Sequence, residues 1–265
     1  MKFGFIGFGE VSYNLSRILL SKGFDVLTSL EGRSEKTVNL AHSLDIDILD
    51  SFEDVARESD VLISANSPSS ALAVALKYGS LTDDIFLDFN NISPSTSLEI
   101  ANYLSEDHFV DSAIMGNVRS DELNLFFSGK RAYELKEFID DHSSRNPEIK
   151  VNVAVVGDRI GAASALKVLR SSYTKGVSAL LIETFEIAEK FGITDDLWDV
   201  LVLTEGEEFL KSSKSRIENS YKSSKRKYEE MEQLMDFLES YDFEDDEELM
   251  LKATRDKFES LKNRE

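Results

Sequence analysis

A lysine among apolar residues in the second half of the chain is the side chain best placed for acid–base chemistry. Lys167 lies in a segment, residues 161–191, whose apolar side chains cover most of the circumference of a helix. Ser171 and Thr174 follow at i+4 and i+7, so all three share one face. Desolvation and a nearby cation such as Arg170 would lower the pKa of this lysine from its ordinary value of about 10.4. It could then take a hydroxyl proton in an alcohol oxidation, or its ammonium group could simply reach solvent along the apolar stem.

A glycine turn near the N-terminus has the form of a dinucleotide-binding loop. The apolar run 3–6 leads into Gly7, Phe8, Gly9, Glu10 and Val11, and a helical pattern follows. The first glycine permits a tight turn, and the second lets backbone approach a pyrophosphate at the helix N-terminus. Ser12 stands where this motif normally has a third Gly or Ala. The placement predicts that residues 7–11 contact a nucleotide, with an unliganded glycine turn as the alternative.

The residues after the second apolar run bear on the choice between NADP and NAD. Ser29 stands at the expected strand tip, where an acidic residue would select NAD. Arg33 and Ser34 open the next helix, so a guanidinium, a hydroxyl and helix N–H groups could converge on a phosphate. This arrangement favours NADP, although Glu31 leaves NAD open.

Short apolar runs alternate with helical patterns over the first part of the chain, which is typical of a parallel sheet covered by helices. The expected strands are 3–6, 25–29, 61–65, 85–88, 109–111, 124–128 and 150–156, and the expected helices include 11–20, 36–43 and 69–78. Beyond residue 157 only helical patterns follow. The sequence therefore predicts an α/β Rossmann-type domain, 1–159, with a doubly wound, mostly parallel sheet, and an all-α substrate or dimerisation domain, 160–265, entered by a long helix.

Composition excludes several classes of protein. The 265 residues carry a net charge of −20, which disfavours binding to nucleic acid or to anionic membranes. The chain has no cysteine, so disulfides, zinc ribbons and thiol nucleophiles are excluded, and with three histidines in the nucleotide half we expect no metal site. His42, His108 and His142 are interpreted as ordinary surface residues. The basic stretch 211–227 and the acidic stretch 242–248 are interpreted as solvated surface. No apolar run is long enough to span a bilayer, and we expect a cytoplasmic protein.

Four motifs in order resemble the β-hydroxyacid dehydrogenases and 6-phosphogluconate dehydrogenases. These are GFIGFGEVS from residue 4, the Asp-x-Asn-Asn-x-x-Pro stretch at 88–94, FVDSAIMGNV from residue 109 and the helix start at 161–167. The resemblance extends to about residue 191 and is greatest to a branch without an assigned substrate that has a short helical C-terminal domain.

The resemblance implies roles for particular residues. Lys167 matches the proton-transferring lysine of the family's G-x-G-x-x-x-K helix, with Ala163 at the second glycine. The substrate loop corresponds to 111–117, where only the aspartate and one glycine are kept. Ser171 and Thr174 replace the family's Asn and the Glu of the decarboxylating enzymes, so phosphogluconate is not expected as substrate. Cofactor contacts are implied for Asn66, Ser67, Pro68, Asn90 and Asn91, although an Asx turn explains the last two equally well.

These observations predict an NADP-preferring oxidoreductase that acts on a small anionic hydroxy acid, with Lys167 as general acid or base. The candidate substrate contacts are Met115, Gly116, Asn117, Arg119, Arg170, Ser171 and Thr174, with Tyr173 and Lys175 ranked lower because they lie off the face of Lys167. Two alternatives stay open: an NADP-binding sensor without turnover, and an imine reductase. The apolar circumference of helix 161–191 also predicts that it is covered by the other domain or by a second subunit, and so favours a homodimer.

Overall fold

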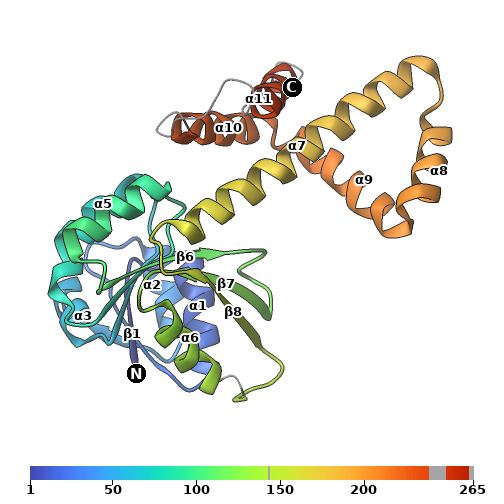
Figure 1. Ribbon diagram of the computed structural model, residues 1–265. Coiled ribbons are helices and arrows are strands. Elements are labelled where there is room, and N and C mark those ends of the chain that lie inside the picture. The colour runs from blue at the N-terminus through green and yellow to red at the C-terminus, as the bar shows by residue number, and fades with distance from the viewer. Residues whose placement is uncertain (143, 239–248, 263–265) are drawn as a thin grey trace. The chain divides into compact units, whose positions relative to one another are not determined.

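The computed structural model describes residues 1–142, 144–238 and 249–262, which form two compact units, Met1–Lys167 and Val168–Glu265 (Figure 1). The acidic stretch 242–248 lies outside the described residues.

The first unit is built on an eight-stranded sheet. Its strands are β1 (Lys2–Ile6), β2 (Asp25–Ser29), β3 (Asp47–Leu49), β4 (Val61–Ser64), β5 (Ile85–Asp88), β6 (Phe109–Ile114), β7 (Glu122–Ser128) and β8 (Lys150–Gly157). They lie in the order β3-β2-β1-β4-β5-β6-β7-β8, and every neighbouring pair is parallel except β6 and β7. The chain reverses its direction of winding between β1 and β4, which is the position where doubly wound sheets bind ligands.

Helices cover both faces of this sheet (Figure 1). They are α1 (Glu10–Ser21), α2 (Glu35–His42), α3 (Phe52–Glu58), α4 (Ala71–Tyr78), α5 (Pro94–Leu104) and α6 (Ala132–Asp141), with short 3₁₀ turns η1 (Pro68–Ser70) and η2 (Gly79–Leu81). One buried cluster joins α1, α2 and α6 to the sheet, and a second joins α3, α4 and α5 to its other face. The predicted Rossmann-type class with a mostly parallel sheet is confirmed.

All seven predicted strands are present, within a few residues of their expected bounds. The eighth, β3, was not predicted. Its three residues lie at the sheet edge and are exposed or half-buried, and Asp47 opens it, so it lacks the apolar signal of the buried strands.

The second unit is helical, as predicted. Most of α7 (Ala162–Phe191) belongs to it, followed by α8 (Thr194–Glu205), α9 (Glu207–Lys222), α10 (Ser224–Leu238) and α11 (Leu249–Lys262). Its core gathers Ile182 of α7, Met231 of α10 and Phe258 of α11, all fully buried. The first turns of α7, up to Lys167, belong to the first unit, so the long helix starts in the sheet-containing part of the chain. Among the described residues, no helix is long and apolar enough to cross a membrane.

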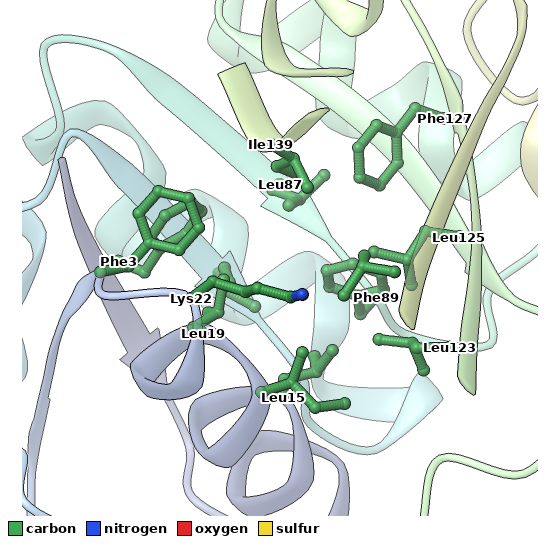
Figure 2. Close-up of a pocket in the computed structure, with 14 residues that line it drawn as sticks. Phe3, Leu15, Leu19, Lys22, Leu87, Phe89, Leu123, Leu125, Phe127 and Ile139 are labelled. Atoms are coloured by element: carbon green, nitrogen blue, oxygen red, sulfur yellow. The ribbon is translucent and has the colours of Figure 1, made fainter. Parts of the chain in front are cut away.

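The buried Lys22 links the end of α1 to the segment just before β8. Lys22, at the end of α1, is 2% exposed, and Figure 2 shows its side chain lying among apolar residues that include Leu15, Phe89 and Leu123. Its Nζ donates to the carbonyl oxygens of residues 145, 146 and 149, at 2.7, 3.0 and 2.6 Å. Burial lowers the pKa of Lys22. The cavity beside it holds only about 30 Å³, which is too small for a cofactor, so we regard this lysine as structural.

Candidate active site

The glycine turn lies between β1 and α1, at the carboxyl edge of the sheet. Gly7 has φ +94°, and a β-carbon there would collide with the side-chain oxygen of Asn66, so this position requires glycine. At Gly9 a β-carbon would meet nothing within 4 Å, and no side chain caps α1. Open space beside an uncapped helix N-terminus fits a pyrophosphate. Ser12, at the third motif position, is buried and donates to the carbonyl of Gly7 at 2.8 Å, which holds the turn closed.

Two residues predicted to contact ligands, Glu10 and Arg119, form an ion pair with each other. Arg119, from the segment between β6 and β7, forms an ion pair with Glu10 in the first turn of α1. Hydrogen bonding to Arg119 lowers the pKa of Glu10. The pair joins the expected substrate loop to the expected nucleotide loop. Neighbouring Gly116 and Asn117 are exposed, Met115 is half-buried, and Val11 is half-buried beside the fully buried Phe8.

Four residues surround the carboxyl end of β2. Ser29 is buried, and its hydroxyl accepts a hydrogen bond from the backbone N–H of Glu31 at 3.2 Å. Glu31 and Arg33 are exposed. The guanidinium of Arg33 lies 4.6 Å from the centre of the Phe52 ring, and Ser34 caps α2 through the N–H of Thr37. The guanidinium of Arg33 thus lies over a ring of α3, while Ser34 occupies the N-cap of α2; their convergence on a phosphate stays a prediction.

The segments after β4 and β5 are bonded together through Asn90. Its Nδ2 donates to Ser64 Oγ and to Asp88, both at 2.7 Å, and its Oδ1 accepts from the backbone N–H of Asn66 at 2.5 Å. Both hydrogens of this buried amide are therefore used inside the protein. The backbone N–H of Asn90 donates to Asp88 Oδ1 at 2.8 Å, so the side chain that forms an Asx turn here is that of Asp88. Asn91, Ser67 and Pro68 are exposed at the same edge.

Lys167 lies one to two turns into α7 and is half-buried. Burial lowers the pKa of its ammonium group, while the charges of Asp88 and Asp111 act in the opposite direction. Both carboxyl groups are fully buried: Asp88 is the last residue of β5, and Asp111 lies opposite it as the third residue of β6. Burial also raises the pKa of Asp88 to about 7, and the negative charge of Asp111 adds to this rise while hydrogen bonds from Asn90 oppose it. A partly desolvated lysine above two buried carboxyl groups is an arrangement suited to proton transfer.

The sequence did not reveal this carboxylate pair as part of the site. Asp88 and Asp111 each stand at the end of an apolar run, 23 residues apart, and only the parallel pairing of β5 with β6 brings them opposite each other. An acid that directly follows apolar residues in each of two neighbouring predicted strands is the signal that could have found them.

Three predicted substrate contacts lie further along α7, and the three histidines lie in the first unit. Arg170, Ser171 and Thr174 belong to the second unit. There the hydroxyl of Ser171 accepts from Lys175 Nζ at 2.5 Å, and Lys175 also pairs with Glu230 at 3.0 Å. Of the histidines, His108 and His142 bond to backbone carbonyls and His42 is exposed.

The comparisons with known proteins agree with this architecture. Residues 2–91 match the family described as "NADP oxidoreductase coenzyme F420-dependent", and residues 188–261 match a domain of unknown function, DUF1932. The "Uncharacterized 28.5 kDa protein in 7S RNA 5'region" of Methanothermus fervidus is 40% identical over 98% of this chain and 99% of its own. A solved structure reported to resemble 3-hydroxyacid dehydrogenases is 38% identical, covers 99% of this chain and 97% of its own, and gives a TM-score of 0.86.

The chain belongs to this 3-hydroxyacid dehydrogenase-like family. The likeness in fold extends to 3-hydroxyisobutyrate dehydrogenase from Mycobacterium tuberculosis, at 16% identity with 99% of this chain and 94% of that chain covered and a TM-score of 0.79. It extends more weakly to an imine reductase from Streptomyces aurantiacus, at 13% identity with 98% and 94% covered and a TM-score of 0.54. The predicted family resemblance is confirmed, and the first unit of this family member has an NAD(P)-binding fold.

Proposed function

We propose that this family member is an NADP-preferring oxidoreductase that transfers hydride between the nicotinamide cofactor and a small anionic hydroxy acid. The observation that carries the proposal is Lys167, which is half-buried and feels the charges of Asp88 and Asp111, a buried pair on the adjacent strands β5 and β6. A bound NADP(H) would accept or supply the hydride. The chain itself must therefore move one proton.

Lys167 is suited to accept and donate that proton. Desolvation favours its neutral amine, which can accept a proton from a substrate hydroxyl during oxidation. In the reverse direction the ammonium group donates a proton to the carbonyl oxygen. The charges of the two acidic neighbours act against the desolvation and favour the ammonium form.

The cofactor would lie along the carboxyl edge of the sheet. The open N-terminus of α1 at Gly9 would receive the pyrophosphate, and Arg33 with Ser34 would bind the ribose phosphate that distinguishes NADP. The exposed segments at Ser67, Pro68 and Asn91 would line the same edge. For the substrate anion, Arg170 would supply positive charge one turn beyond Lys167, since Arg119 already pairs with Glu10. Gly116, Asn117, Ser171 and Thr174 remain the proposed polar contacts.

Replacement of the lysine tests the proposal. Lys167→Ala should lower turnover by roughly 10²- to 10⁴-fold, the usual contribution of a general acid or base, with the Kd for NADPH nearly unchanged. Turnover would be measured over a panel of hydroxy acids and oxo acids, and Kd by cofactor fluorescence. Lys190→Ala, at an exposed lysine of the same helix, is the matched control and should behave as wild type. Unchanged turnover in Lys167→Ala would remove the lysine from the mechanism.

The same assay addresses the two alternatives. Imine substrates belong in the panel because a lysine could serve a C=N bond as well as a C=O bond and because the fold is shared with an imine reductase. Tight NADPH binding without turnover of any substrate would favour a nucleotide sensor.

We also propose a homodimer formed through α7. Leu169, Tyr173, Leu180, Ile187 and Phe191 lie at spacings of four and seven residues, hence on one face, and are 61, 69, 61, 49 and 74% exposed. A continuous apolar stripe of this length on a single chain is a typical subunit interface.

A further inference from the structure

Asp111 is saturated with hydrogen bonds from three different elements. Its Oδ1 accepts from Ser97 Oγ of α5 at 3.2 Å and from Ser164 Oγ of α7 at 2.6 Å. Its Oδ2 accepts from Ser128 Oγ of β7 at 2.9 Å and from the backbone N–H of Ser164 at 3.0 Å. All four groups donate to this fully buried carboxyl group, so each of its two oxygens accepts two hydrogen bonds.

These bonds cap the longest helix of the protein. The backbone N–H of Ser164 donates directly to Asp111, and that of Ala163 donates at 3.0 Å to Ser128 Oγ, which itself donates to Asp111. The first N–H groups of a helix have no partner within it, and negative charge near them is stabilising. The cap of α7 therefore lies on strand β6, 53 residues earlier in the chain.

Lys167 follows Ser164 by three residues and so lies on the next turn above the capped N–H groups. The charges of Asp88 and Asp111 both act on its ammonium group, and the charge of Asp111 also acts on Asp88. One carboxylate thus fixes the backbone that carries the lysine and contributes to the field at its ammonium group.

We propose that Asp111 is a positioning residue for Lys167: it holds the first turn of α7 through Ser164 and Ser128, and together with Asp88 it supplies the negative charge that lets the lysine regain a proton after giving one up. The relevance to turnover rests on the proposed function. The electrostatic part can be measured without a substrate.

Asp111→Asn is the informative variant, because it removes the charge and keeps the shape. The amide oxygen can remain at the Oδ2 position and accept from the Ser164 N–H and the Ser128 hydroxyl. The new NH₂ group then replaces Oδ1 and faces only the hydroxyls of Ser97 and Ser164, which can rotate and accept. The variant is therefore expected to fold, which circular dichroism would verify.

The readout is the pKa of Lys167 by NMR after reductive ¹³C-methylation, with its signal assigned as the one missing in Lys167→Arg. In Asp111→Asn we expect the pKa of Lys167 to fall by about one unit further, since an opposite charge nearby typically shifts a pKa by one to three units. If turnover is found, the pH-rate limb assigned to Lys167 should move to lower pH by the same amount. Ser97→Ala is the control: it removes one hydrogen bond but no charge, and the pKa of Lys167 should stay at the wild-type value.

An unchanged pKa of Lys167 in a folded Asp111→Asn would overturn the inference even if Lys167→Ala abolishes turnover. A shifted pKa with no turnover on any substrate would support the inference and refute the proposed oxidoreductase. If Asp111→Asn fails to fold, the unfolding free energy of Lys167→Met is measured at pH 5, where Asp88 holds a proton and Asp111 is left as the acidic neighbour of the ammonium group. A lower unfolding free energy than wild type at pH 5 would support the inference, and an unchanged one would overturn it.

Discussion

At the scale of single residues, Arg33 and Glu31 bear on the choice of cofactor: the arginine favours NADP and the glutamate favours NAD. Both are exposed just beyond β2, and only the arginine lies next to a helix N-terminus. Arg33→Ala should weaken NADPH binding by roughly ten-fold or more, the value of one charge-assisted hydrogen bond, and leave NADH binding unchanged. Fluorescence titration with both cofactors measures this, with Arg57→Ala as the control at another exposed arginine. A wild-type protein that binds NADH more tightly than NADPH would refute the NADP preference.

The raised pKa of Asp88 predicts how the unfolding free energy of the protein depends on pH. Burial raises its pKa from 3.8 to about 7, so the folded protein holds a proton that the unfolded chain releases above pH 4. The corresponding stabilisation is complete below the unfolded pKa and is lost as pH rises through 7. Between pH 5 and pH 8, wild type should therefore lose about 2 to 3 kcal/mol more unfolding free energy than Asp88→Asn. Urea unfolding at the two pH values tests this, and parallel pH dependences would contradict it.

Lys167 could be predicted from the sequence because a lysine in a mostly apolar helix is a local anomaly. The serines that bind Asp111 could not, because Ser97, Ser128 and Ser164 are ordinary residues of three separate elements. Their shared partner exists only after β6 has paired with both β5 and β7. Local patterns reveal unusual residues, whereas a hydrogen-bond network depends on tertiary contacts.

At the scale of elements, the start of α7 depends on one glycine. Gly161 has φ +84°, and a β-carbon there would lie 2.9 Å from Pro94 Cβ and 3.1 Å from its carbonyl oxygen. Gly161→Ala should therefore add a steric cost to the backbone strain and destabilise the protein by about 2 to 4 kcal/mol. Gly32→Ala isolates the strain, because Gly32 has φ +65° and nothing lies within 4 Å of its β-carbon position. In denaturant unfolding, Gly32→Ala should lose the smaller unfolding free energy, about 1 kcal/mol. Equal losses of unfolding free energy in the two variants would rule out the steric contact with Pro94.

The elements themselves were largely predictable. Buried strands such as β2 and β5 were predicted with their observed bounds because both faces of a parallel sheet are covered, which produces continuous apolar runs. Helix α7 was predicted to within one residue because its apolar pattern is long. Strand β3 was not predicted because it lies at the sheet edge and is exposed or half-buried, so it lacks the continuous apolar run by which the other strands were recognised.

At the scale of the whole molecule, the exposed stripe on α7 predicts the state of assembly. Leu180→Glu places a charge in the centre of that stripe and should convert the proposed dimer to a monomer at micromolar concentration. Sedimentation velocity would detect the change. Lys190→Glu, which also introduces an acid into α7 but at an exposed polar position, should leave the dimer intact. A wild-type protein that sediments as a monomer would refute the proposal.

The contacts of Lys22 have a consequence for how the first unit comes apart. The three carbonyl groups that hold its ammonium lie just before the last strand of the sheet, while the lysine ends the first helix. If either segment opened alone, the ammonium group of Lys22 would lose its three carbonyl acceptors, and its apolar surroundings offer no replacement. Amide hydrogens of β1 and β8 should therefore exchange with a common opening free energy, so that this half of the protein behaves as a single cooperative block from its first strand to its last.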